Sequence, residues 1–389
     1  MHKDIFLKSY ADKYQKVCVG CGICRTICPH NSISMKLSED GFYVPEYDSS
    51  SCTNCGLCAE VCPIFVNDYQ KSGAKSYVYT SDNDHLISSV SSGGFAFDFS
   101  KAALKQGYKG CGVIYDNNPG TCKHIIYNSR EGLELTKGSK YIPSYTIDAF
   151  AEMFTAKEKY VVFGTPCQIS GLRNLINMKK VTDRFILVDF FCHGVPSYNL
   201  WFKYLDHLKR KYKFEKIEKL SFRAKKYGWH NFTVMYENGG STYSSDATID
   251  NDLFYKFFLG DFCLNDCCYN CKYKLLKSCA DIRMGDCWSH KYAADKRGIS
   301  GVCALTTLGK DALSIFKLGG ALNTEETSVV LEGQMADSPD KDAKVEKIKG
   351  LLRSDKTLEY INKNCLTPRT IDRIKQAIKN LIKQALCRS

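Results

Sequence analysis

Features that mark membrane, secreted and nucleic-acid-binding proteins are missing from this sequence. No stretch approaches the run of about 18 apolar residues that a membrane-spanning helix needs. Residues 1–16 are polar and charged, without the apolar core of a secretory signal peptide. These absences predict a cytoplasmic protein without a transmembrane segment.

A nucleic-acid-binding signature is also lacking, although the formal net charge is +12. The lysines are spread over the whole chain, and no dense basic patch with interleaved aromatic residues stands out. The fingerprint G-x-G-x-x-G is absent as well, which disfavours a nicotinamide cofactor bound in the standard way. We therefore predict no nucleic-acid partner, and we attribute the positive charge to an acidic electron carrier or a phosphorylated ligand.

Cysteine, in contrast, is abundant, with 21 in 389 residues. In a reducing compartment such thiols are metal ligands or catalytic groups rather than disulfides. The pattern Cys-x-x-Cys-x-x-Cys-x-x-x-Cys-Pro occurs twice, at residues 18–29 and 52–63. This is the bacterial run that holds two cubane [4Fe–4S] clusters, in which the fourth cysteine of each run ligates the other cluster. The first predicted ligand set is Cys18, Cys21, Cys24 and Cys62, and the second is Cys52, Cys55, Cys58 and Cys28.

Structural zinc is the alternative for such cysteines, because it also favours Cys-x-x-Cys pairs. Zinc uses two pairs of ligands, however, and has no use for three evenly spaced thiols followed by Cys-Pro. The repeat extends beyond the ligands, since Gly22 corresponds to Gly56 and Ile23 to Leu57. We therefore predict a two-cluster ferredoxin-type domain over residues 1–70, with short strands at 33–36 and 42–47.

Alternating strand and helix signals follow the ferredoxin-type unit. The apolar runs 160–164 and 185–191 are typical of buried strands in a parallel sheet. Each is followed by a polar turn and a helix, and ligands of open α/β sheets bind beyond such strand ends. The segments 219–223 and 232–236 resemble a hairpin-type pair. The expected fold class is therefore α+β and α/β, with a ferredoxin unit before a mixed α/β domain over residues 76–320.

A third group of cysteines follows within the second domain. The Cys268-x-x-Cys271 pair supplies two metal ligands, and Cys263 is a candidate for a third. The residues alone leave open an iron–sulfur cluster, a zinc site and scattered thiols. A cluster is favoured because electrons delivered by the ferredoxin-type unit need an acceptor. The six cysteines of this group are Cys263, Cys267, Cys268, Cys271, Cys279 and Cys287.

The last part of the chain, residues 321–389, is predicted to be a polar segment followed by a basic amphipathic helix over 369–388. Such a helix can pack on its own domain, and it can also contact an anionic membrane surface or a partner protein. Peripheral membrane contact and a homo-oligomer are both compatible with this sequence.

Several motifs, in this order, resemble the coenzyme F420 hydrogenase/dehydrogenase beta-subunit family. They lie at residues 91–94, 137–141, 164–168, 192–197, 221–223, 268–271 and 281–286. The resemblance runs from about residue 77 to residue 308. It implies a flavin-binding domain with bound FAD, a [4Fe–4S] cluster beside it, and electrons paired on the flavin. Hydroxymethyl chlorophyll reductases share the family, so the fold does not fix the substrate.

The same resemblance implies which residues form the site. Its motif cysteines correspond to Cys167, Cys263, Cys268 and Cys271 as ligands of the third cluster, with Cys192 as the main rival. The glycine-rich turn before a helix can approach a phosphate closely. The residues that we expect to contact the cofactor are Ser92, Gly93, Gly94, Lys140, Tyr141, Thr165 and Pro166.

Two ionisable residues lie on or directly after the second buried strand. His193 is the candidate catalytic residue, because imidazole can donate a proton near neutral pH, although it can equally orient a loop. Asp189 lies within the apolar run, where a carboxylate needs a partner, and Arg223 is a candidate for that partner.

The predicted function is that of an iron–sulfur flavoprotein oxidoreductase. A ferredoxin or similar carrier loads the N-terminal clusters, the third cluster feeds FAD, and an unidentified organic acceptor receives a hydride. We expect loops at 227–231 and 241–252 to form the acceptor pocket. One alternative is a non-catalytic subunit that exchanges electrons between coenzyme F420 and a partner dehydrogenase or hydrogenase. A metal-stabilised basic binding protein is the remaining alternative.

Overall fold

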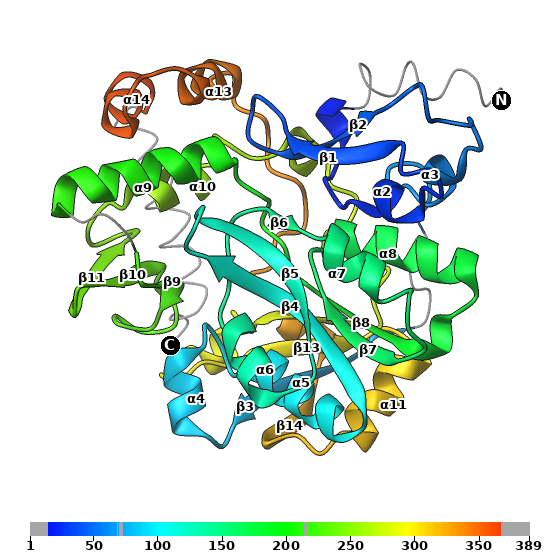
Figure 1. The fold of residues 1–389 in the computed structure, drawn as a ribbon. Helices are drawn as coiled ribbons and strands as arrows, with labels where there is room; N and C mark the ends of the chain where they lie inside the picture. Colours follow the sequence, from blue (N-terminus) through cyan, green and yellow to red (C-terminus); the bar gives the residue numbers. More distant parts are fainter. Residues whose placement is uncertain (1–14, 68, 70–72, 214–216, 367–389) are drawn as a thin grey trace.

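The centre of the molecule is a nine-stranded mixed sheet, seen in a computed structural model that describes residues 15–67, 69, 73–213 and 217–366 (Figure 1). The strand order is β14-β3-β13-β12-β8-β7-β4-β5-β6. In chain order the strands are β3 (Lys75–Ser81), β4 (Tyr108–Asp116), β5 (Thr121–Tyr127), β6 (Ser144–Tyr145), β7 (Lys159–Phe163), β8 (Phe185–Phe190), β12 (Ile282–Asp286), β13 (Ser300–Ala304) and β14 (Gly320–Glu325).

The middle of this sheet is parallel and its flanks are largely antiparallel. Strands β4, β7, β8 and β12 are parallel neighbours, whereas β5, β13, β3 and β14 each pair antiparallel with a neighbour. β7 and β8 are apolar on both faces because helices cover both faces of the sheet. The expected mixed α/β fold and the two buried parallel strands are thus confirmed.

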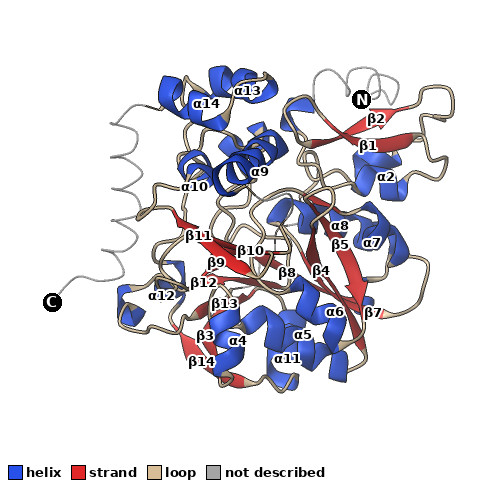
Figure 2. Cartoon of the chain, turned by 60° about the vertical axis from the view of Figure 1, so that its left-hand side comes forward, coloured by secondary structure: helices blue, strands red, loops and turns tan. Residues whose placement is uncertain are grey.

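Helices cover the two faces of the sheet in separate groups. On one face, α5 (Phe95–Lys105) and α11 (Thr307–Ile315) share an apolar cluster with β7 and β8, and α4 (Asp84–Ser89) and α6 (Arg130–Thr136) lie beside them (Figure 2). On the other face, α7 (Ile147–Glu152) and α8 (Pro166–Lys179) pack through Phe150, Ile169 and Leu172. α8 begins directly after the end of β7 and therefore carries the 164–168 motif.

The ferredoxin-type unit lies against α7 and α8 (Figure 1). It contains η1 (Gln15–Val17), α2 (Ile23–Ile27), α3 (Leu57–Glu60) and the antiparallel pair β1 (Ile33–Leu37) and β2 (Tyr43–Tyr47). Gly22 and Gly56 precede α2 and α3 with φ of 73° and 81°, a left-handed conformation that favours glycine. Both copies of the cysteine run therefore turn into their short helices in the same way.

A second layer of helices and a small sheet complete the fold. The helices α9 (Tyr198–Tyr212), α10 (Leu253–Phe258), α13 (Val345–Arg353) and α14 (Leu358–Cys365) share one large apolar cluster. The small sheet has the order β11-β10-β9, with β9 (Lys219–Ala224), β10 (Thr233–Asn238) and β11 (Ser241–Asp246). β9 and β10 pair antiparallel, as expected. The remaining elements are η2 (Thr182–Arg184), η3 (Asp266–Asn270), η4 (His290–Tyr292) and α12 (Thr327–Leu331).

The C-terminal part departs from the sequence-based expectation. β14 continues the large sheet to Glu325, past the proposed boundary at residue 320, and α12, α13 and α14 occupy much of the expected polar segment. These helices bury apolar residues such as Val330 and Ile348. The segment is polar on average, so its composition alone did not predict these buried helices. The expected helix at 369–388 lies outside the described residues. Within the described residues, no helix is both long and apolar enough to span a membrane.

Candidate cluster and cofactor site

The first four predicted cluster ligands lie together in the ferredoxin-type unit. Burial raises the pKa of the Cys21 thiol well above its usual value, and Cys62, Cys24 and Cys18 raise it further by charge repulsion. Burial raises the pKa of Cys18 to about 12, with Cys62 again contributing. These mutual effects mean that the four thiols are close neighbours, and Cys18, Cys21 and Cys62 are buried.

The second predicted set lies nearer the surface. Burial raises the pKa of Cys58 to about 11, and the thiols of Cys55 and Cys52 add to the effect. Cys55 is exposed, whereas Cys52 and Cys28 are partly buried. The Cys58 thiol also acts on Cys24 of the first set, so the two sets are neighbours.

A third set of thiols meets at the carboxyl ends of β7 and β8. Cys167 lies in the first turn of α8, Cys192 follows β8, and Cys268 and Cys271 come from the region of η3. Burial raises the pKa of Cys167 to about 12, with Cys268 and Cys271 contributing. Burial also raises the pKa of Cys192 well above its usual value, with Cys268 and Cys167 contributing. The parallel β7–β8 pair brings its two strand ends to one edge of the sheet, and this places Cys167 beside Cys192.

Cys263, a predicted ligand, lies elsewhere. It is fully buried in the apolar cluster beneath α9 and α10. Burial raises its pKa, and besides a backbone hydrogen bond from Ser197 the groups that act on it most are Asp261 and Lys349, not thiols. Its backbone oxygen accepts a hydrogen bond from Ser197 N (3.0 Å).

The other cysteines of this region have different surroundings. Cys267 interacts with Cys268, Cys167 and Cys18, and so lies between the third set and the first. The Cys279 thiol donates to Ser170 Oγ (3.4 Å). Cys287 belongs to a separate apolar cluster. These positions explain why six cysteines close in sequence do not form one site.

Each of the three thiol sets has four members, the number of ligands that a cubane iron–sulfur cluster takes. Among the described residues, no three His, Cys, Asp or Glu side chains lie close enough together to hold a single metal ion. A cubane cluster has an iron at each of four corners, so its thiolate ligands stand further apart than those of one zinc ion. Sets of four thiols suit the larger group.

One turn of α8 joins the first and third thiol sets. Gly171 lies four residues after Cys167, on the same side of the helix. A Cβ atom at Gly171 would lie 3.1 Å from Cys21 Sγ and 3.0 Å from Ile23 Cγ1, so glycine allows the close approach. Asn265, which caps η3, donates from Nδ2 to the backbone oxygen of Cys18 (3.1 Å).

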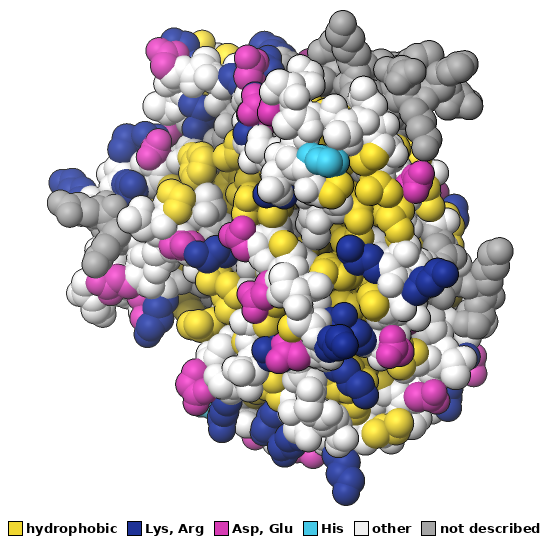
Figure 3. Space-filling view, turned by 45° about the vertical axis from the view of Figure 1, so that its right-hand side comes forward, with side chains coloured by type: hydrophobic (Ala, Val, Ile, Leu, Met, Phe, Trp, Pro, Cys, Tyr) yellow, Lys and Arg dark blue, Asp and Glu magenta, His cyan; other side chains and the backbone are white. Residues whose placement is uncertain are grey.

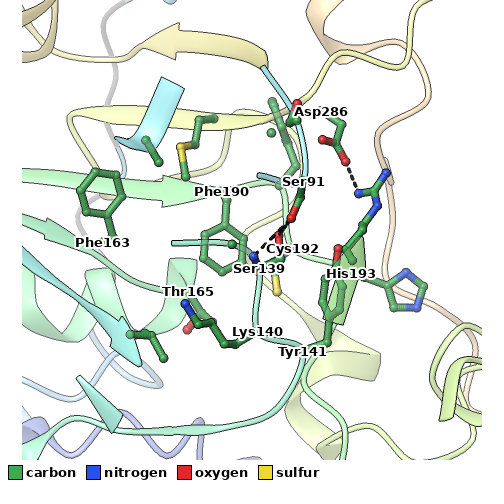
Figure 4. A pocket seen from close by; sticks show the side chains of 18 of the residues that line it. Ser91, Ser139, Lys140, Tyr141, Phe163, Thr165, Phe190, Cys192, His193 and Asp286 are labelled. Carbon is green, nitrogen blue, oxygen red and sulfur yellow. Dashed lines mark hydrogen bonds and ion pairs between the residues drawn. The ribbon is translucent and has the colours of Figure 1, made fainter. Parts of the chain in front are cut away.

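A cavity of about 450 Å³ opens beside the third thiol set. Cys192 is part of its wall, and Figure 4 shows this residue between Phe190 and Tyr141. Gly93 and Pro166 do not line the cavity, nor does any residue of 227–231 or 241–252, so the expected acceptor loops are not part of this wall. Gly93 has a packing role instead, because a Cβ there would collide with Tyr79 O and lie 2.7 Å from Ser300 N. The predicted site residues that do line the cavity are Ser92, Gly94, Lys140, Tyr141, Thr165 and His193.

One end of the cavity has the features of an anion cradle. Gly94 precedes α5 with φ of 86°, so the helix directs free backbone N–H groups toward the loop at 91–94. Lys225 holds this loop by donating from Nζ to Ser92 O (2.7 Å), and Ser91 Oγ lies 3.0 Å from Ser139 Oγ (Figure 4). Burial lowers the pKa of Lys140 to about 8, and its ammonium donates only to backbone oxygens in the described structure. A phosphate-bearing cofactor fits this end.

A neighbouring part of the cavity wall is aromatic. It adjoins the anion cradle because Asp286 pairs with Ser300, whose side chain holds Gly93 of the 91–94 loop. Arg223 forms an ion pair with Asp286, and its guanidinium lies 4.4 Å from the ring centre of Phe232 and 5.0 Å from that of Trp288. Arg223 is therefore not the partner of Asp189, which instead binds Arg283 through two hydrogen bonds of 2.6 and 2.7 Å. The aromatic wall suits a planar group, because a stacked arginine and indole present extended flat surfaces.

His193 is oriented by a carboxylate at the cavity wall. Its Nε2 lies 2.8 Å from Asp261 Oδ1, and its ring packs edge-on against Phe258 with 5.0 Å between ring centres. Asp261 has a left-handed φ of 61°, a conformation that non-glycine residues rarely adopt. The imidazole is thus fixed in place, as either role expected for it requires.

Comparisons with known proteins agree with the sequence motifs. Residues 157–329 match the family model for the C terminus of the beta subunit of coenzyme F420 hydrogenase/dehydrogenase, and residues 17–66 match the model of the 4Fe-4S dicluster domain. A curated relative, the F subunit of F(420)H(2) dehydrogenase from Methanosarcina mazei, is 26% identical over 188 residues, which is 44% of this chain and 51% of the relative. The chain thus spans about half the length of this relative.

A solved structure is also similar. It is described as a xenon derivatization of the F420-reducing [NiFe] hydrogenase complex from Methanosarcina barkeri, with a TM-score of 0.45 and 18% identity. The alignment covers 81% of this chain and 94% of that chain. The two family-model matches cover separate parts of the chain, and both agree with the resemblance read from the sequence motifs.

Proposed function

We propose that this protein is an iron–sulfur electron-transfer subunit that carries single electrons between a protein partner and a redox cofactor in the cavity. The observation that supports it most is the serial arrangement of the thiol sets. The second set contains the exposed Cys55, the first is buried behind it, and the third forms part of the cavity wall. The curated relative is described as a dehydrogenase subunit, which favours a subunit over a free-standing reductase.

The proposed ligands of the two N-terminal clusters are those expected from the cysteine runs. For the third cluster we propose Cys192 in place of Cys263, because Cys192 interacts with Cys167 and Cys268, whereas no thiol is among the groups that act on Cys263 most. A [4Fe–4S] cluster, when bound, takes up and releases one electron at a time. The proposed third set is Cys167, Cys192, Cys268 and Cys271.

We propose that the cavity holds a flavin whose phosphates lie at the anion cradle. Ser92, Gly94 and the start of α5 would provide backbone N–H groups, and Lys140 would provide the counter-charge. A flavin, when bound, can exchange single electrons on one side and an electron pair on the other. We propose that the acceptor binds at the aromatic wall around Trp288, and the family description makes coenzyme F420 a candidate for it.

His193 is proposed to move a proton at this wall. Asp261 Oδ1 lies within hydrogen-bond distance of His193 Nε2. The other ring nitrogen of His193, Nδ1, would then exchange the proton with the ligand. A protein carrier such as a ferredoxin is the proposed partner on the side of Cys55. The formal net charge of +12 suits an acidic carrier, and Figure 3 shows basic side chains interspersed with acidic and hydrophobic ones on one face of the molecule.

Anaerobic purification with iron, sulfide and flavin analysis tests this proposal. Three clusters correspond to about twelve irons per chain. Cys192→Ser should lose about four of them, whereas the matched variant Cys263→Ser should retain all, because no thiol is among the groups that act on Cys263 most. Wild-type protein with about eight irons and no flavin would rule out both the third cluster and the cavity cofactor.

A further inference from the structure

Lys274 is a buried cation that the described residues leave without a counter-ion. It follows Cys271 by three residues and is only 7% exposed. Its Nζ donates to the backbone oxygens of Cys192 (3.0 Å) and His193 (3.1 Å) and lies 3.8 Å from Met335 Sδ. It also lines the cavity, so it stands between the third thiol set and the cofactor space.

Other buried cations near the third set are neutralised. Lys349, 3% exposed, lies 2.7 Å from Asp266, and Arg283, fully buried, pairs with Asp189. Lys274 has no such carboxylate among the residues that the structure describes. An unpaired buried charge is costly, which makes an anionic group at this point energetically favourable.

The Lys274 ammonium adjoins one of the proposed ligands directly. Its Nζ donates to the backbone oxygen of Cys192, so its charge lies beside the third set.

We propose that Lys274 raises the reduction potential of the third cluster. This inference rests on the proposed function, since it requires a cluster at the third set. A cluster held by four thiolates is anionic and gains one further negative charge on reduction, with no bond formed or broken. A nearby fixed cation stabilises the reduced form more than the oxidised form by the Coulomb energy of that added charge. A higher reduction potential at the third cluster favours electron transfer from the clusters near Cys55 toward the cavity wall.

The test is an anaerobic redox titration followed by electron paramagnetic resonance. Lys274→Gln keeps an amide donor for the backbone oxygens and removes the charge. We expect the equilibrium constant for reducing the third cluster to fall at least tenfold, a shift of about 59 mV for one electron, with the other two clusters unchanged. Lys274→Arg should stay near the wild-type value. Lys277→Gln, an exposed lysine three residues along the chain, is the matched control and should change nothing.

The outcomes separate this inference from the proposed function. If Lys274→Gln retains about twelve irons and the third potential does not move, the inference is wrong and the proposed function stands. If wild-type protein lacks the third cluster, the proposed function fails first. If Lys274→Gln loses about four irons, the iron content of Lys274→Arg distinguishes the two explanations. Full iron content in Lys274→Arg would show that the positive charge stabilises the anionic cluster. A loss of about four irons in Lys274→Arg as well would overturn the inference.

Discussion

The ion pair between Asp189 and Arg283 should be one of the most sensitive points in the fold. Both side chains are fully buried, and the register of β8 with β12 places the two residues directly opposite each other. Arg283 Nε and Nη2 donate to the two carboxylate oxygens at 2.7 and 2.6 Å, and Ser278 Oγ donates at 2.7 Å. Asp189→Asn preserves the shape but leaves the guanidinium without a counter-charge.

Breaking a buried pair in this way costs about 3–5 kcal/mol. A domain of 150–250 residues loses about 2–4 °C in Tm per kcal/mol, and the lower figure suits this longer chain of 389 residues. We therefore expect the Tm of Asp189→Asn to fall by about 6–10 °C, measured anaerobically by circular dichroism. Glu237→Gln is the control, because its pair with Lys219 is exposed and worth less than about 1 kcal/mol.

A double variant tests the physical cause. Arg283→Gln added to Asp189→Asn removes the uncompensated charge, so the combined loss should be smaller than the sum of the single losses by about 1 kcal/mol or more. Additive losses, or a fall of no more than about 2 °C for Asp189→Asn, would refute the argument that an isolated buried charge dominates this site.

Three further predictions concern other parts of the molecule. Burial lowers the pKa of His124 to about 4. The unfolded chain therefore binds more protons between pH 4 and 6.5, and stability should fall as pH decreases through that window; denaturant titrations should show a shallower pH dependence for His124→Gln. Gly93→Ala should lower stability and flavin content, because the new Cβ meets the backbone of β3, whereas Gly73→Ala, with nothing within 4 Å, should be neutral. Lys140→Met should weaken flavin retention at least tenfold by equilibrium dialysis, while Lys137→Met, whose lysine already pairs with Glu134, should do so less.

Local spacing in the sequence was enough to predict the ferredoxin-type unit. Each cysteine run is a short continuous segment, so its ligand geometry depends on a few neighbouring residues and a glycine before each helix. The buried strands β7 and β8 were equally predictable, because a short apolar run between polar turns is typical of a strand buried on both faces. The same argument identified the polar turns after these strands as site positions, and both contribute cavity residues.

The family resemblance named Cys167, Cys268 and Cys271, but the choice between Cys263 and its rival Cys192 required the tertiary structure. By spacing, Cys263 was as good a candidate as any, since it lies only five residues before Cys268, but that stretch of chain buries it under α9 and α10. Cys192 lies 76 residues before Cys268 and joins it only because β8 ends beside α8. Likewise, the register of β8 with β12 places Asp189 opposite Arg283, so Arg283 and not Arg223 is its partner.

The sequence therefore determined which chemistry this protein carries, because cluster ligands in continuous runs are encoded by residue type and spacing. The tertiary structure alone decided which distant thiols and charges share a site. Cys192, Cys167 and Arg283 owe their positions to the order and register of the parallel strands, which bring residues far apart in the chain together.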